Sequence, residues 1–539
     1  MFRKALTTSL ALILAAVMMC SCAASPSSPQ EDALSSAQSV SGDASGQEEY
    51  APSYPIVADK ISVKGVIIGE NIDISQPRLV WQKLEEITNI HVDWELISKD
   101  ALAVFLASND WPDFFHRGDP IDNTYINDYG IIGGRFANYQ DYLEYMPNLQ
   151  QTFSDYPDAR KVVTETNGAI YQLPYIGKDC TAVVARMYYR EDTLKEAGCQ
   201  VPATVDEFHD VLARLKEHNK GAAPLAEDRE EFLWASFGTG KNPDFEDDGS
   251  GKVIFNRISE QYKLYLKYMS QLYSEGLLHK EYLTLDDATK LSLAAEGRTV
   301  FGHDGLSNLA EDAFKSGRVE LNQLAPLTSE YDKTQTVLGW RFCQPGGMLI
   351  NSECKYVKEL CRMFDVMFAT EEIAEGTGIN GTAFVYGPEG TSWKWANSDH
   401  TEYELILPKE LEGKKTFDTY SYEDLIFADL GRFDEFANAT TATEGNNKAR
   451  QQGFVKNLVP YSETSPFPGD YLKFTEEEQG TIDEAYTTIA TYVKEMKGKF
   501  ITGVMNVDTE WEDYVSKING MGLDKVLGAY QAAYDRWNS

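Results

Sequence analysis

The chain has 539 residues, more than one hydrophobic core usually holds, so at least two lobes are expected. Its formal net charge of −35 argues against a nucleic-acid partner, because binding to phosphate backbones requires clustered lysine and arginine. Hydrophobic residues at 42% and aromatic residues at 12% are sufficient for globular cores.

The N-terminus has the order of a lipoprotein signal peptide. A basic start precedes an apolar run at 5–19 that is too short to span a membrane, and Ser21 and Cys22 follow. This order predicts a signal peptide at 1–21 and a lipid on Cys22; a cleaved secretory signal without a lipid is the alternative. Residues 22–55, mostly small, polar and acidic, are expected to form a disordered linker behind the lipid anchor.

A strand–helix–strand pattern begins near residue 60. Residues 61–68 and 90–96 are typical of strands, and 79–87 have helical spacing, which favours a βαβ unit and a parallel sheet. The next strand is expected at 113–115. Ligands of an open parallel sheet lie beyond the carboxyl ends of its strands. The residues expected to bind a ligand there, with a solvated turn as the alternative, are His116, Arg117 and Asp119.

The stretch 168–198 has the order of a passage between two lobes. Residues 168–174 and 181–190 are rich in strand formers, and 191–197 read as a short helix that ends at Gly198. This order resembles the first interlobe crossing of the extracellular solute-binding proteins of family 1, the lipoproteins of Gram-positive ABC importers for carbohydrates. Other segments resemble the same family in order along the chain, among them LASNDWPDFF, LYSEGLL and WEDYVSKINGMGLDKVLGAYQAAYDRW.

The resemblance implies an α/β fold with two lobes, periplasmic-binding-protein-like (type II), with hinge crossings and a helical C-terminal extension. Lobe 1 is expected to comprise 56–176 plus about 335–382, and lobe 2 to comprise 177–334 plus about 383–539. The C-terminal helices are also indicated by the residues alone, because Thr475 and Glu478 have capping-box spacing before an apolar stripe.

The resemblance also implies where a ligand would bind. In the second crossing, Trp340 is expected to stack on a sugar and Arg341 to hold its hydroxyl groups, with interlobe packing as the alternative for Trp340. Trp234 is expected to supply a second stacking face, with a core position as the alternative. Further residues predicted at the ligand are Tyr175, His303, Asp304 and Trp393.

Two other signals favour structural roles. Residues 244–255 begin like a calcium loop, but the twelfth position is Phe255 rather than glutamate, so a hairpin turn at Asp248 and Gly249 is the better interpretation. Neither a metal nor a cofactor is expected. Cys180 and Cys343 flank proposed crossings, which leaves open a disulfide or two buried thiols.

These features predict a monomeric sugar-binding lipoprotein that captures an extracellular sugar or oligosaccharide by lobe closure and delivers it to an ABC permease. It would lie outside the cell, anchored to the outer face of the membrane by its lipid. No phosphate loop or hydrolase motif is present, so no enzyme activity is expected. The alternatives are a surface polysaccharide hydrolase or lyase, which needs only two carboxylates, and a peptide-binding lipoprotein.

Overall fold

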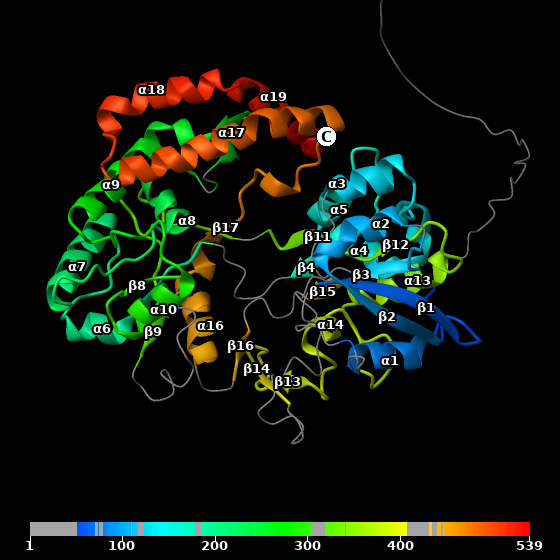
Figure 1. The fold of residues 1–539 in the computed structure, drawn as a ribbon. Coiled ribbons are helices and arrows are strands. Elements are labelled where there is room, and N and C mark those ends of the chain that lie inside the picture. Colours follow the sequence, from blue (N-terminus) through cyan, green and yellow to red (C-terminus); the bar gives the residue numbers. More distant parts are fainter. Residues whose placement is uncertain are drawn as a thin grey trace, which may run out of the picture. The chain divides into compact units, whose positions relative to one another are not determined.

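The structure is a computed structural model, shown as a ribbon in Figure 1. It describes residues 51–69, 74, 79–108, 110–116, 123–177, 185–240, 242, 244–303, 319–339, 341–406, 431–433, 439–442 and 446–539. The predictions for the signal peptide, for Cys22 and for most of the linker lie outside these residues.

A four-stranded sheet with the order β12-β3-β1-β2 organises the first part of the chain. Its strands are β1 (Ile61–Ile68), β2 (Ile90–Ile97), β3 (Phe114–His116) and β12 (Leu349–Ile350). β1 runs parallel to β2 and to β3, whereas β12 is antiparallel to β3. Helix α1 (Leu79–Thr88) connects β1 to β2, which confirms the predicted βαβ unit.

Helices pack on this sheet and enclose two buried cores, one that includes Phe114, Leu360 and Phe364 and one that includes Leu106, Phe115 and Ile126. Those helices are η1 (Lys99–Ala101), α2 (Leu102–Ala107), α3 (Asn123–Tyr125), the π-helix η2 (Ile126–Ile132), η3 (Tyr139–Tyr145), α4 (Pro147–Asp155), α5 (Pro157–Val163), α13 (Val357–Asp365), η6 (Val366–Phe368) and α14 (Ala383–Tyr386). The family resemblance described above also places a third crossing between the lobes near residues 382–386, but this segment forms helix α14.

A small sheet lies where the chain leaves this first core. It consists of β4 (Leu173–Gly177), β11 (Cys343–Gly347) and β15 (Gly431–Phe433), in the order β11-β4-β15. β4 and β11 belong to the first and second predicted crossings, and they pair antiparallel. The predicted crossings therefore come together in one sheet although they are far apart in sequence.

A second and larger core surrounds the sheet β8-β5-β9, formed by β5 (Tyr188–Arg190), β8 (Phe301–Gly302) and β9 (Leu321–Gln323). The hairpin of β6 (Phe245–Asp247) and β7 (Val253–Phe255) confirms the predicted turn at Asp248 and Gly249. Helices of this core are α6 (Glu191–Glu196), α7 (Val205–His218), α8 (Glu230–Leu233), η4 (Trp234–Phe237), η5 (Asn256–Ile258), α9 (Glu260–Ser274), α10 (Asp287–Ala295) and α16 (Asn446–Asn457).

Three helices end the chain and pack on the second core: α17 (Glu476–Ile501), α18 (Val507–Gly520) and α19 (Leu523–Asn538) (Figure 1). The side chain of Thr475 accepts from the backbone of Glu478 and the Glu478 carboxylate accepts from the backbone of Thr475, which confirms the predicted capping box. The helical C-terminal extension is thus confirmed. The remaining elements are β10 (Val337–Leu338), β13 (Trp393–Trp395), β14 (Glu402–Leu405), β16 (Thr440–Thr441), η9 (Val459–Tyr461), β17 (Ser462–Glu463) and η10 (Gly469–Tyr471).

Within the part of the chain that the structure describes, no helix is both long and apolar enough to cross a membrane. The described cysteines, Cys199, Cys343, Cys354 and Cys361, are buried free thiols. Because Cys343 is a free thiol, the predicted alternative of a disulfide between Cys180 and Cys343 does not fit the structure; Cys180 itself lies outside the described residues.

Candidate functional site

The indole of Trp234, a predicted stacking face, lies inside the second core. Its side chain is 1% exposed, and its ring centroid is 5.1 Å from that of Tyr262 and 6.2 Å from that of Tyr265. An indole enclosed in this way has no face open to a sugar. The predicted ligand role of Trp234 therefore does not fit the structure, whereas the alternative, a core position, does.

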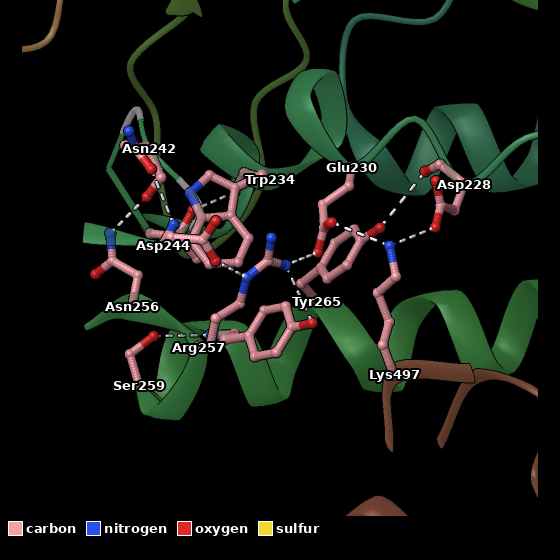
Figure 2. A network of polar contacts seen from close by, with 12 residues as sticks. Asp228, Glu230, Trp234, Asn242, Asp244, Asn256, Arg257, Ser259, Tyr265 and Lys497 are labelled. Carbon is pink, nitrogen blue, oxygen red and sulfur yellow. Dashed lines mark hydrogen bonds and ion pairs between the residues drawn. The ribbon is translucent and has the colours of Figure 1, made fainter. Parts of the chain in front are cut away.

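Trp234 packs against a network of buried and partly exposed charges, which Figure 2 shows. The guanidinium carbon of Arg257 lies 5.7 Å from the Trp234 ring, and Arg257 pairs with Asp244 (2.7 Å) and with Glu230. Glu230 has a second cation as a partner, Lys497. The Lys497 ammonium group lies 3.1 Å from the Glu230 carboxylate and 2.9 Å from the Asp228 carboxylate. Burial opposes the charge on Lys497, but Glu230 and Asp228 hold its pKa above the usual value. The network ties η5, α8 and α17 together.

Arg341, the predicted polar clamp, is engaged within the protein. Its guanidinium forms an ion pair with Asp158 of α5 and donates a hydrogen bond of 2.9 Å to the carbonyl oxygen of Ser465. It also lies 5.5 Å from the ring of Trp537. These contacts connect a crossing strand to α5 and α19, so they give Arg341 a structural role that the sequence did not indicate.

Trp393 and His116 are also buried rather than open. Trp393 is 2% exposed and donates from Nε1 to the carbonyl oxygen of Gly387 at 3.0 Å. His116 is 1% exposed, with its ring near those of Trp81 and Trp94. Neither predicted ligand residue presents a free surface in this structure.

Tyr175 is partly buried in β4, within the crossing sheet. Its ring lies over the backbone of Gly177, because a Cβ atom at Gly177 would come within 1.8 Å of the Tyr175 hydroxyl oxygen. The remaining predicted ligand residues lie outside the described residues and stay predictions; they are Arg117, Asp119, Asp304 and Trp340.

His303 is the predicted residue that the structure places in a polar cluster. Its ring centroid is 5.9 Å from that of Tyr188, and its backbone N–H donates to the Glu227 carboxylate at 3.0 Å. Around Tyr188 lie three arginines from separate segments. We call this group the Tyr188 cluster; its members are Arg186, Tyr188, Glu227, Arg229, His303 and Arg450.

Strand order explains why these residues meet. β5 pairs antiparallel with both β8 and β9, so the start of β5 and the ends of β8 and β9 share one edge of the sheet. The chain reaches β5 from the crossing strand β4, so this edge is the one at which the chain enters the second core. Arg186 precedes β5 and His303 follows β8, while α16 brings Arg450 to the same edge.

Contacts within the cluster fix its geometry. Arg450 Nη2 lies 3.2 Å from the Tyr188 hydroxyl oxygen. Arg229 donates to the backbone carbonyl oxygen of Arg186 at 2.7 Å and lies 3.7 Å from the Glu227 carboxylate. The Arg229 and Glu227 side chains are only 12% and 11% exposed. The attraction between their charges is therefore stronger than in a fully solvated pair. The ring of Tyr188 is fully buried, but its three arginine neighbours are partly exposed, and such a group of donors can bind the polar groups of a sugar.

Sequence reasoning missed most of this cluster. Arg186 and Tyr188 fall inside the stretch 168–198 that indicated the crossing, so their position was a usable signal. Glu227, Arg229 and Arg450 carried no motif, because they reach the cluster only through the packing of separate segments.

A cavity of about 650 Å³ lies elsewhere, between α5 and α19. Basic side chains line it, but two of them already have partners: Lys473 pairs with Glu165 at 2.9 Å and Arg536 with Glu478. None of the members of the Tyr188 cluster lines this cavity. Among the described residues, no group of histidine, cysteine or acidic side chains could hold a metal ion.

Comparisons with known proteins relate the chain to transport proteins. The fructooligosaccharide ABC transporter substrate-binding protein FusA of Streptococcus pneumoniae is 25% identical over 498 residues, which cover 86% of this chain and 87% of FusA. An extracellular solute-binding protein from Bifidobacterium longum subsp. infantis superposes with a TM-score of 0.69 at 19% identity, and the alginate-binding protein AlgQ2 with 0.61 at 22% identity. Each of these two alignments covers 89% of this chain and 99% of the other. No protein-family model matches the chain.

These findings define the chain as having the two-lobed α/β fold of solute-binding proteins. Over most of its length it is a homologue of ABC-transporter substrate-binding proteins. The predicted resemblance is therefore confirmed.

Proposed function

We propose that this protein is the substrate-binding component of an ABC importer, capturing an extracellular oligosaccharide and passing it to a membrane permease. The observation that carries this proposal is the sequence similarity to FusA, which extends over 86% of the chain. FusA is named as the substrate-binding protein of a fructooligosaccharide ABC transporter. The Tyr188 cluster supports it, since its three partly exposed arginines bring several hydrogen-bond donors together. We place the protein outside the cell, held at the membrane by a lipid on Cys22 and working as a monomer.

The proposed mechanism is binding without chemistry. A sugar that contacts both lobes favours their closed arrangement, and a shift from mostly open to mostly closed requires a preference of roughly 5 kcal/mol. We propose that lobe 1 comprises residues 56–176 and about 335–382. Lobe 2 would then comprise residues 177–334 and about 383–539. Small-angle scattering should show compaction when the sugar is added. An unchanged scattering curve at saturation would contradict closure.

A thermal-shift screen of the protein without its first 21 residues tests the ligand class. The panel would contain neutral oligosaccharides, acidic oligosaccharides and short peptides at equal concentration. Because a ligand that binds only the folded state stabilises it, we expect the melting temperature to rise with at least one oligosaccharide and with none of the peptides. A rise with peptides alone would favour a peptide-binding lipoprotein and overturn the proposal.

A further inference from the structure

Three guanidinium groups converge at the Tyr188 cluster. The Arg450 guanidinium carbon lies 5.5 Å from the centre of the Tyr188 ring, and that of Arg186 lies 5.6 Å from the ring of Phe454. The rings of Tyr188 and Phe454 are themselves 6.4 Å apart. Since Arg229 hydrogen-bonds to the backbone of Arg186, all three arginines belong to one group.

Negative charge is scarce in this group. Glu227 pairs with Arg229, but among the residues that the structure describes, neither Arg186 nor Arg450 has a carboxylate within 4.0 Å. Four other partly or fully buried arginines do have such partners, namely Arg190, Arg257, Arg341 and Arg432, whereas the partly buried Arg135 instead lies over the ring of Trp111. This contrast matters because the chain carries 84 acidic residues against 49 lysines and arginines, so unpaired arginines are not a consequence of composition.

The three arginines also have unused donors. The Nε atoms of Arg186, Arg229 and Arg450 are buried and have no hydrogen-bond partner within the described part of the chain. A buried donor without a partner is unfavourable, and a guanidinium group binds a carboxylate through two parallel hydrogen bonds. The cluster is therefore a site that an added carboxylate would complete.

We propose that the ligand is an acidic oligosaccharide, and that the Tyr188 cluster binds the carboxylate of one of its uronic acid units. This inference rests on the proposed function and narrows its substrate class. Arg186 and Arg450 bind the carboxylate, the buried Tyr188 positions Arg450 through its hydroxyl group, and Glu227 holds Arg229 in place. A neutral sugar would leave the charge of Arg186 and Arg450 without a counter-charge.

The test is calorimetric titration of the protein without its first 21 residues. The probes are oligogalacturonate, alginate oligosaccharide, the fully methyl-esterified oligogalacturonate and a fructo-oligosaccharide. Esterification keeps the sugar rings and the chain length but removes the charge. We expect an acidic probe to bind, its affinity to fall with added salt, and its methyl ester to bind at least tenfold more weakly.

Two substitutions locate the carboxylate. Arg450→Gln and Arg186→Gln should each weaken binding of the acidic probe about ten- to a hundredfold. Arg298→Gln is the matched control, because Arg298 is 51% exposed and pairs with Glu296 at 3.6 Å. Melting temperatures of all three variants show whether they fold.

Each outcome decides the question. Tight binding of the fructo-oligosaccharide that is insensitive to the two arginine substitutions would overturn the acidic-ligand proposal and leave the proposed function intact. Acidic binding that persists after esterification, or in folded Arg186→Gln and Arg450→Gln, would also overturn it. Binding of neither acidic nor neutral probes would count against the proposed function itself.

Discussion

Arg450 donates a hydrogen bond of 3.2 Å to the hydroxyl oxygen of Tyr188, although 262 positions separate the two residues in the sequence. The contact joins α16 to the edge of the β8-β5-β9 sheet, where the chain enters from the crossing strand β4. It fixes the direction of the Tyr188 hydroxyl group and places a positive charge beside an aromatic ring. Arg450 belongs to the site that we assign to the ligand, and the buried Tyr188 holds it in position.

Trp234 should prove to be a core residue rather than a binding residue. Replacing it with alanine removes a fully buried indole, so we expect Trp234→Ala to lower the free energy of unfolding by about 3–5 kcal/mol. Denaturation in urea measures the loss. Trp395→Ala is the control, because Trp395 is only partly buried, and its loss should be smaller. Unchanged stability together with lost sugar binding would return Trp234 to the ligand site.

Lys497 should be essential for the buried charge network. Lys497→Met leaves the partly buried carboxylate of Asp228 without its cation and removes one of the two cations at the buried Glu230, so we expect a loss of about 2–3 kcal/mol in the free energy of unfolding. Lys499→Met, two positions along the same helix, removes a surface pair with Glu495 and should change little. Equal losses for the two variants in urea denaturation would show that the network contributes no more than a surface pair.

Asp365 should make stability depend on pH. Its carboxylate accepts hydrogen bonds from the backbone of Leu149 (2.8 Å) and Asn148 (3.3 Å), so it caps α4, for which Met146 provides no side-chain cap. Burial raises the pKa of Asp365 to about 7, although the hydrogen bonds from Leu149 and Asn148 act in the opposite direction. The folded protein therefore holds this proton more tightly than the unfolded chain does.

The sign of the effect follows from this raised pKa. The contribution of the protonated Asp365 to the free energy of unfolding is fully present below about pH 4, and it is lost as the pH rises through about 7. We expect Asp365→Asn to remove this decline, with a difference from the parent protein on the order of 4 kcal/mol across that range. Urea denaturation at several pH values measures it. Parallel pH profiles for the two proteins would contradict the assignment.

Cys22 should anchor the protein. Two acyl chains hold a protein stably at a membrane, whereas one binds only marginally. Cys22→Ala should therefore release the protein into the medium or leave its signal peptide unprocessed, as seen by fractionation and by mass. Cys20→Ala is the control, because bulky Met19 precedes Cys20 and it is the poorer acceptor. Unchanged membrane retention and processing of Cys22→Ala would disprove lipidation.

Local patterns predicted the local structure well. The alternation at 90–96, the helical spacing at 79–87 and the capping box at Thr475 each depend on neighbouring residues, and each is present in the structure. Residues 382–386 were expected to cross between lobes but form α14, because a short apolar run fits either a strand or a helix.

The site was harder to predict, because burial depends on the whole fold. A tryptophan among apolar residues fits both a binding face and a core, and Trp234 and Trp393 both proved to be buried. Arg341 was expected to meet a sugar, yet it meets Asp158, which lies 183 positions away. The arginines of the Tyr188 cluster could not be grouped from sequence for the same reason.

The most direct test of the central claim is a single titration in which both binding and the fate of the sugar are measured. The purified protein without its first 21 residues is titrated calorimetrically with the oligosaccharide that raises its melting temperature most, and the sugar is then recovered and analysed by chromatography. We predict saturable binding at one site per chain and recovery of the sugar at its original length. Steady release of shortened sugar by the pure protein would contradict the claim and identify the protein as a hydrolase or lyase.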